Sequence, residues 1–217
     1  MFSLNLKSIL QSRDKLKITV IDSGLGGIAF SKSIKVDINH LDVSLLIDKD
    51  GFPYGDKNLE WLRERLNFLV NSSKSNVVII ACNTLSSLIF FYDMNFNKTV
   101  VDVITPTIYF LQRTNKKNIC IIATKNTIKM DIYSKLLICN IKYLDASDLI
   151  SDLEYKNNYI DSLNALVNNV DSGIDAVILG CTHLIEIKEE FRKRLDTEIV
   201  SQDEIFISLF KNDFTKK

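Results

Sequence analysis

Glycine and proline are scarce in this chain, which contains 7 glycines and 2 prolines among 217 residues. A usual glycine share is about 7%, so the few glycines present are expected where the backbone geometry requires one. No stretch rich in glycine, serine or proline forms a linker, so any domain boundary is expected to be tight. Each glycine is therefore a pointer to a constrained position.

Charge of one sign and long apolar runs are also missing. The 27 basic side chains equal the 27 acidic ones, which disfavours a nucleic-acid-binding surface. No apolar run approaches the about 20 residues of a membrane span, and residues 1–12 lack the pattern of a signal peptide. Because 46% of the residues are hydrophobic, a disordered or fibrous chain is excluded. The sequence predicts one large or two small globular domains, without nucleic-acid or membrane partners.

None of the four cysteines is in a C-x-x-C motif; they are Cys82, Cys120, Cys139 and Cys181. Nothing suggests secretion, so free thiols in a reducing, cytoplasmic environment are expected. Cys120 and Cys139 fall inside a predicted strand and a predicted helix, where cysteine is ordinary apolar filling.

Short, β-branched apolar runs alternate with amphipathic stretches along the chain. Continuous apolar runs are typical of parallel strands that are buried on both faces. Strands are predicted at 17–21, 43–47, 77–81, 100–104, 119–123, 141–144, 176–179 and 198–200. Helices are predicted at 58–71, 127–139, 159–170 and 186–194. The alternation predicts an α/β fold with mainly parallel sheets.

Two segments recur about one hundred positions later in the chain, which indicates an internal repeat. Residues 17–23 align with 118–124, and the strand that precedes Cys82 aligns with the one that precedes Cys181. We therefore predict two pseudo-symmetric α/β domains with the active site in the cleft between them. The predicted extents are 1–103, with segment 200–217 packing back on it, and 104–199.

Four predicted strands end in polar residues, and open parallel sheets bind ligands outside these carboxyl ends. The exits are Asp22-Ser23-Gly24, Cys82-Asn83-Thr84, Ala123-Thr124 and Cys181-Thr182-His183. If the halves face each other, Cys82 and Cys181 approach one cleft from opposite sides. Small donors for a carboxylate, some of which also cap helices, are Ser23, Asn83, Thr84, Thr124 and Thr182.

Two thiols on opposite sides of a small ligand are the arrangement that inversion at a carbon centre needs. One cysteine, as thiolate, removes the α-proton, and the other, as thiol, protonates the opposite face. A free thiol has a pKa near about 8.5, which is close enough to neutral for both roles. Asp22 and His183 are predicted to tune the thiols, one near each.

Two other interpretations of these residues exist. The residues after the first strand carry a G-x-G-x-x-A pattern, starting at Gly24, that formally fits a dinucleotide-binding motif. However, the negative charge of Asp22 would repel the pyrophosphate of a bound dinucleotide. Cys82, Cys181 and His183 would supply three ligands of a catalytic zinc, but their C-x-H spacing is unusual. We predict neither a cofactor nor a metal.

The loop at 51–57 holds two glycines and one of the two prolines, directly after a predicted strand. A turn is the simplest interpretation. The functional interpretation is a rigid loop that presents backbone amides, including that of Gly55, and the Tyr54 hydroxyl to the same cleft.

Together these features resemble the glutamate racemases of the cofactor-independent aspartate/glutamate racemase family. The matching pieces are Asp22-Ser23-Gly24-Leu25-Gly26-Gly27, Asp48, Pro53-Tyr54-Gly55, Ala81-Cys82-Asn83-Thr84, Thr124 and Gly180-Cys181-Thr182-His183. The resemblance implies a cytoplasmic homodimer that interconverts L- and D-glutamate without pyridoxal phosphate and provides D-glutamate for peptidoglycan. It implies that Cys82 and Cys181 are the acid/base pair. The residues that would bind the substrate or tune the thiols are Asp22, Ser23, Tyr54, Gly55, Asn83, Thr84, Thr182 and His183.

The chain departs from the family pattern after Cys139, where it is shorter. The family carries a glutamate there that supports the histidine, and the candidates in this sequence are Asp148, Asp152 and Glu154. The residues alone do not choose among them.

Two further departures concern pairs of residues near the end of the chain. Leu184-Ile185 replaces the family's Tyr-Pro, and Ser201-Gln202 replaces an Asp-Ser pair. Aspartate, or a related small acidic substrate, is therefore an alternative to glutamate. A shortened glutamate-binding protein without turnover is the alternative from another functional class.

Overall fold

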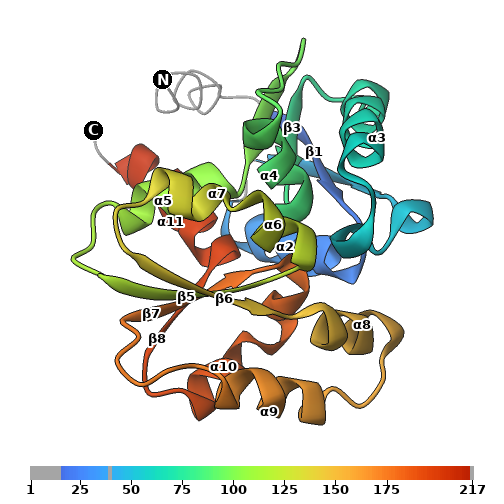
Figure 1. Ribbon diagram of the computed structural model, residues 1–217. Helices are drawn as coiled ribbons and strands as arrows, with labels where there is room; N and C mark the ends of the chain where they lie inside the picture. The colour runs from blue at the N-terminus through green and yellow to red at the C-terminus, as the bar shows by residue number, and fades with distance from the viewer. Residues whose placement is uncertain (1–15, 39–40, 216–217) are drawn as a thin grey trace.

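The computed structural model describes residues 16–38 and 41–215 (Figure 1). The prediction that residues 1–12 are not a signal peptide concerns residues that lie outside the described ranges, as do the last two lysines. The described chain forms two four-stranded sheets, and every strand pair within them is parallel. This confirms the predicted α/β fold class.

The two sheets have the same strand order, β2-β1-β3-β4 in the first and β6-β5-β7-β8 in the second. The strands are β1 (Leu16–Asp22), β2 (Leu41–Ile47), β3 (Val77–Ile80), β4 (Thr99–Asp102), β5 (Asn118–Ala123), β6 (Asn140–Asp145), β7 (Ala176–Gly180) and β8 (Glu198–Ser201). In this shared order, β1 occupies the same position in the first sheet as β5 does in the second, and β3 the same position as β7. These are the two pairs of strands that the internal repeat in the sequence aligns. The carboxyl ends of these four strands carry the polar exits.

Helices and 3₁₀ turns connect the strands. The helices are α2 (Leu25–Asp37), α3 (Leu59–Ser72), α4 (Asn83–Phe91), α5 (Ile104–Leu111), α6 (Lys125–Met130), α7 (Ile132–Leu136), α8 (Ser147–Tyr155), α9 (Ile160–Asn168), α10 (Lys188–Arg194) and α11 (Gln202–Thr215). The 3₁₀ turns are η1 (Lys49–Gly51), η2 (Tyr54–Asp56) and η3 (Thr182–Ile187).

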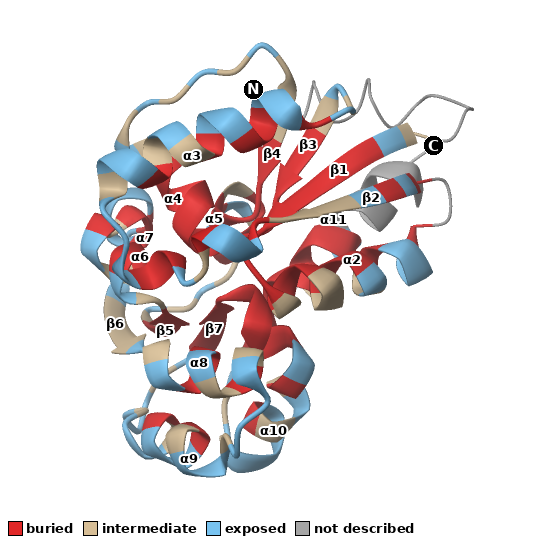
Figure 2. Ribbon diagram, turned by 90° about the vertical axis from the view of Figure 1, so that its right-hand side faces the viewer, coloured by how far each residue is buried: buried red, intermediate tan, exposed pale blue. Residues whose placement is uncertain are grey.

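The central strands are buried on both faces, as Figure 2 shows for β1, β3, β5 and β7. Successive residues of β3 point to opposite sides of the first sheet. Val78 and Ile80 pack in a cluster with α3 and α4, whereas Ile79 packs with Phe30 and Ile34 of α2. This two-sided burial explains why the strands are continuous apolar runs in the sequence.

The C-terminal segment returns to the first half of the molecule. Phe206 of α11 packs edge-on against Phe30 of α2, with ring centroids 5.4 Å apart, and the Ser33 hydroxyl donates to the buried Asp203 carboxylate at 2.7 Å. The domain boundaries after residues 103 and 199 stay predictions.

The structure differs from the expected elements in two helical stretches. Residues 127–139 do not form one helix, because Asp131 adopts a left-handed conformation (φ 52°) between α6 and α7 and accepts a hydrogen bond from Tyr143. Residues 182–187 form a 3₁₀ turn before α10. Ile104, expected to end a strand, begins α5, and the Asp102 carboxylate accepts from the Thr105 amide at 2.7 Å in the first turn of that helix.

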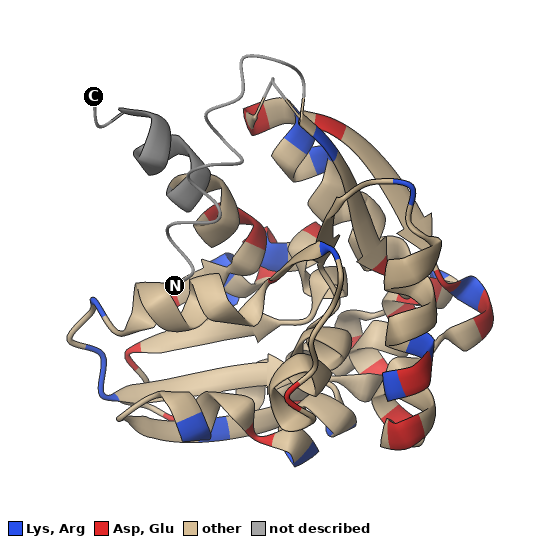
Figure 3. Ribbon diagram, turned by 90° about the horizontal axis from the view of Figure 1, so that it is seen from above, with Lys and Arg blue, Asp and Glu red and all other residues tan. Residues whose placement is uncertain are grey.

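Acidic and basic residues are interspersed over the face drawn in Figure 3. This distribution agrees with the balanced composition of the chain. In the described residues, no helix combines the length and the apolar character that crossing a membrane requires.

The start of α2 approaches the second half so closely that only glycine fits there. A Cβ atom added at Gly26 would lie 2.5 Å from the backbone nitrogen of His183. We expect Gly26→Ala to lower the free energy of unfolding by about 1–3 kcal/mol through overpacking, measured by urea denaturation. Ser31→Ala in the same helix is the control, because its buried hydroxyl has no hydrogen-bond partner among the residues that the structure describes, and its loss should be nearly neutral. Equal stability of Gly26→Ala and wild type would contradict this contact.

Candidate active site

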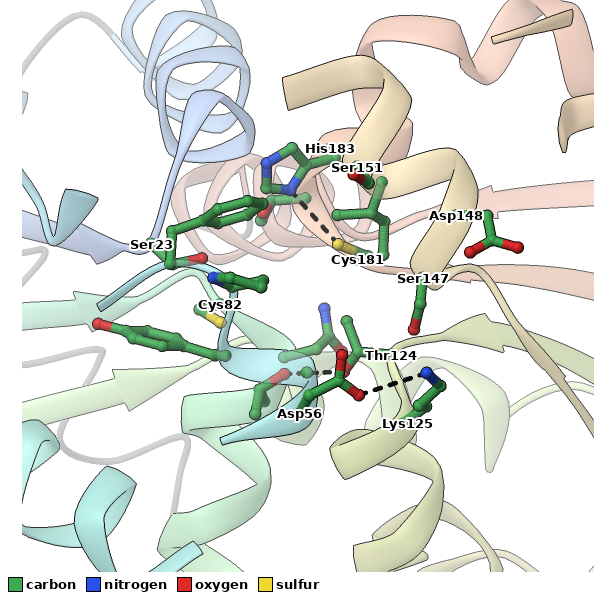
Figure 4. Close-up of a pocket in the computed structure, with 18 of the residues that line it drawn as sticks. Ser23, Asp56, Cys82, Thr124, Lys125, Ser147, Asp148, Ser151, Cys181 and His183 are labelled. Atoms are coloured by element: carbon green, nitrogen blue, oxygen red, sulfur yellow. Dashed lines mark hydrogen bonds and ion pairs between the residues drawn. The ribbon is translucent and has the colours of Figure 1, made fainter. Parts of the chain in front are cut away.

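The carboxyl ends of both sheets border one cavity of about 230 Å³ (Figure 4). The predicted site residues that line it are Ser23, Tyr54, Gly55, Cys82, Asn83, Thr84, Thr124, Cys181, Thr182 and His183. Cys82 enters from the first half and Cys181 from the second. Asp22 is not among the lining residues and lies fully buried. The structure therefore brings together side chains that lie up to 160 positions apart in the sequence, from Ser23 to His183.

Cys82 directly precedes α4 and is 8% exposed. Burial and the Asp22 carboxylate raise the pKa of the Cys82 thiol, while the backbone N–H groups of Thr84 and Leu85 at the start of α4 oppose this shift. The environment therefore favours the protonated thiol, which is the form that delivers a proton.

Cys181 lies beside an imidazole. Its Sγ is 3.5 Å from Nδ1 of His183, whose Nε2 is 2.7 Å from Oε2 of Glu154. Burial lowers the pKa of His183, but the Cys181 sulfur, Glu154 and Asp22 outweigh it and raise the pKa to about 10. His183 is thus a cation at neutral pH, and it lies in hydrogen-bond contact with the Cys181 sulfur. The two thiols therefore differ in their charged neighbours: the Asp22 carboxylate acts on Cys82, and the imidazole of His183 contacts Cys181.

Asp22 ends β1 beneath the cavity. Its carboxylate accepts hydrogen bonds from the Gly24 amide at 3.1 Å and the Thr182 hydroxyl at 2.9 Å. Burial raises the pKa of Asp22, although the charge of His183 and these hydrogen bonds act in the other direction. Its electrostatic influence reaches both Cys82 and His183. Asp22 is placed to tune the site, and its predicted direct contact with substrate stays a prediction.

The Tyr54 hydroxyl is not free in the cavity. It donates a short hydrogen bond to Asp48. Two nitrogens of Arg65 on α3 also donate hydrogen bonds to the Asp48 carboxylate. Burial raises the pKa of Asp48, but the hydrogen bonds from Arg65 and Tyr54 outweigh it and lower the pKa overall. The Tyr54 carbonyl accepts from the Asn126 amide at 2.8 Å. Tyr54 thus anchors the rigid loop, whose other residues border the cavity.

Hydroxyl groups from the two halves meet at one wall. Thr84 Oγ1 of α4 is 2.9 Å from Thr124 Oγ1, and each is within 3.3 Å of the hydroxyl of Thr127. Thr124 is also the N-cap residue of α6, so the capping role expected for small polar residues holds here. A carboxylate at this wall would meet hydroxyls and the amino ends of α4 and α6.

The loop at 51–57 borders the cavity as its functional interpretation predicted, whereas sequence reasoning did not place α8 in the cavity wall. The additional lining residues are Phe52, Pro53, Asp56, Lys125, Ser147, Asp148, Ile150, Ser151 and Tyr155. Phe52 packs its ring 5.7 Å from that of His183, and Lys125 pairs with Asp56 at 3.4 Å across the two halves. The one signal for α8 was its amphipathic pattern, which does not reveal what the helix faces.

The alternative interpretations lose their support in this geometry. Glu154 and Thr182 occupy the space over Gly24 and Gly26 that a pyrophosphate would need. The cavity is smaller than the about 300–1,000 Å³ of drug-sized ligand sites, which suits a small metabolite. In the part of the chain that the structure describes, no three His, Cys, Asp or Glu side chains are grouped to hold a metal ion.

Known proteins resemble the chain over most of its length, although no family model matches it. It is 31% identical over 195 residues to the glutamate racemase of Borreliella burgdorferi, covering 81% of this chain and 72% of that protein. The glutamate racemase structure from Campylobacter jejuni matches with a TM-score of 0.75 at 28% identity, covering 91% and 85% of the two chains. That from Francisella tularensis in complex with D-glutamate matches with a TM-score of 0.73 at 28% identity, covering 94% and 85%.

A cavity bordered by one cysteine from each of two similar α/β halves, on a fold shared with solved racemases, defines this protein as a racemase, an isomerase. The similarity to curated sequences is specific enough to go one step further. The chain belongs to the glutamate racemase family.

Proposed function

We propose that this protein interconverts L-glutamate and D-glutamate by proton transfer between two cysteines, without a cofactor. The observation that carries the proposal is the placement of Cys82 and Cys181 on one cavity, each from a different half and Cys181 in contact with His183. The relatives and structures that match this chain at 28–31% identity are glutamate racemases, which favours glutamate over aspartate as substrate.

In one direction, the Cys181 thiolate removes the α-proton of glutamate and becomes a thiol. The electron pair left at the α-carbon is shared with the α-carboxylate until Cys82 delivers its proton to the opposite face. Cys82 ends the turnover as thiolate and Cys181 as thiol, so the reverse reaction uses the same pair with exchanged roles. In this proposal His183 stabilises the thiolate at position 181, and the charge of Asp22 keeps Cys82 protonated until it delivers its proton.

The carboxylates of the substrate are proposed to bind at the hydroxyl-lined wall of the cavity. Thr84 and Thr124 donate hydroxyls there, at the amino ends of α4 and α6. Ser23 and Thr182 line the cavity on the side of the first strand exit. Helix amino termini attract anions, so the wall suits a dicarboxylate.

The proposal is tested with purified protein and L-glutamate in heavy water without added cofactor. We expect the circular dichroism of the glutamate to decay to zero while deuterium enters at the α-carbon, observed by proton NMR. A glutamate-binding protein without turnover would be stabilised against heat by glutamate yet leave the α-proton in place. That result would overturn the proposal, as would racemisation of aspartate alone.

The wider biological setting extends the same proposal. A cytoplasmic enzyme of this activity would supply D-glutamate for peptidoglycan, and we propose that it acts as a homodimer. Sedimentation of the purified protein tests the oligomeric state, and a monomer at micromolar concentration would remove the dimer from the proposal.

A further inference from the structure

A buried polar cluster joins the beginning of α11 to the cavity. Gln202, the first residue of α11, exchanges two hydrogen bonds with the side chain of Asn83, the residue that follows Cys82. Tyr133 and Thr107 complete the cluster from α7 and α5. All four side chains are at most 3% exposed. Elements from both halves of the molecule therefore converge on one residue of the cavity wall.

The orientation of the Gln202 amide follows from Thr107. Its hydroxyl donates to the Val103 carbonyl at 2.8 Å, so its oxygen is left to accept from Nε2 of Gln202 at 3.1 Å. That fixes the nitrogen of the Gln202 amide on the side of Thr107 and its oxygen toward Asn83. Oε1 of Gln202 then accepts from Nδ2 of Asn83.

The same logic determines how Asn83 faces the cavity. Its Oδ1 accepts from the Tyr133 hydroxyl at 3.0 Å and from Nε2 of Gln202 at 3.1 Å, so both lone pairs of that oxygen are engaged. The two hydrogens of Nε2 are shared among Asn83, Thr107 and Tyr133. Nδ2 of Asn83 carries two hydrogens, and Gln202 takes one. Within the described residues, the second hydrogen has no protein acceptor, and Asn83 lines the cavity. Asn83 thus offers a donor, and no acceptor, to whatever binds there.

We propose that Gln202 is a positioning residue that fixes the Asn83 amide as a hydrogen-bond donor for a carboxylate of the substrate. This inference rests on the proposed function, and it deepens it by assigning a role to the position where the chain departs from the family's Asp-Ser pair. An amide that turned over would present Oδ1 to the carboxylate and repel it. Tyr133 assists by donating to Oδ1.

The test is a double-mutant cycle between Gln202→Met and Asn83→Ala, read as KM and kcat for glutamate and as Kd for D-glutamate by calorimetry. Methionine keeps the length of the side chain and removes its hydrogen bonds. Because the lost interaction holds substrate and transition state alike, we expect KM and Kd to rise about tenfold with kcat within about threefold. In the Asn83→Ala background, Gln202→Met should cause no further rise.

Two variants separate this role from a structural one. Ser33→Ala removes the hydrogen bond that ties α11 to α2 and should lower stability without changing KM. Tyr133→Phe should raise KM by a smaller factor than Gln202→Met, again only when Asn83 is present, and decides the question if Gln202→Met does not fold. A KM unchanged in the folded Gln202→Met and Tyr133→Phe variants, or an equal rise with and without Asn83, would overturn the inference. If the wild-type protein bound D-glutamate without racemising it, the proposed function would be refuted, and the Kd values of the same cycle would still test the role of Gln202. If the wild-type protein neither bound nor racemised glutamate, both the proposed function and this inference would be refuted.

Discussion

Replacing either Cys82 or Cys181 with serine is expected to lower kcat for glutamate racemisation about 10²–10⁴-fold, the usual contribution of a general acid or base. A hydroxyl is nearly the size of a thiol but a much weaker acid, so it neither removes nor delivers the α-proton efficiently. Both sulfurs lie on the cavity, and both transfers are needed for one inversion. Binding of D-glutamate should change much less than turnover, as calorimetry would reveal.

Exchange of the α-proton with solvent distinguishes the two cysteines. Cys82→Ser keeps the base at position 181, so it should still exchange the α-proton of one enantiomer for deuterium, with retention of configuration. Cys181→Ser should do so for the other enantiomer, with Cys82 as the base. Cys139→Ser is the matched control, because Cys139 is half-buried and does not line the cavity. Unchanged racemisation in either active-site variant would exclude the two-cysteine mechanism.

The sequence predicted those parts of the fold and site that local patterns encode. All eight strands were expected, because runs such as those of β3 and β7 are apolar on both faces and end in polar residues. Strand ends of parallel sheets meet at one edge, which brought Cys82 and Cys181 to one cavity in the prediction as in the structure. The internal repeat then indicated two halves with one strand order.

Contacts between distant segments could not be predicted in the same way. The Tyr54 hydroxyl was expected to be free in the cleft, but it donates to Asp48, which Arg65 also binds, and the loop sequence carries no sign of that arginine on α3. The helix break at Asp131 depends on Tyr143, twelve positions on. Gln202 looked like a departure from the family, and its partner Asn83 lies 119 positions earlier. Each of these depends on which elements pack together, which no local pattern specifies.

Glu154 is the acidic residue that supports His183, out of the three that the sequence offered. Oε2 of Glu154 is 2.7 Å from Nε2 of His183 and also accepts from the Leu25 amide at 2.8 Å, at the start of α2 in the other half. Burial raises the pKa of Glu154, but the hydrogen bonds from His183 and Leu25 outweigh it and lower the pKa. Glu154 therefore holds a negative charge against the imidazole across the junction of the halves.

We expect Glu154→Gln to lower kcat about 10²-fold, most strongly in the direction in which Cys181 acts as base, since general acid/base groups contribute about 10²–10⁴. Removing the carboxylate lowers the pKa of His183 below its wild-type value of about 10, so the basic limb of the pH–rate profile should move to lower pH. The pH dependence of the free energy of unfolding should also move to lower pH. A histidine with a raised folded pKa stabilises fully below its unfolded pKa, about 6.5, and loses this as the pH rises through the folded value.

Asp152→Asn on the same helix is the control, because Asp152 accepts from the Ser162 hydroxyl at 2.7 Å and does not line the cavity. It should keep the wild-type pH profile and nearly wild-type kcat. In wild type, urea denaturation at successive pH values should give a free energy of unfolding that falls between about pH 6.5 and about pH 10. In Glu154→Gln this fall should be complete at lower pH, because less proton affinity is left at His183. If Glu154→Gln retained the wild-type profile in both measurements, the charge of His183 would have to come from Asp22 and Cys181 alone.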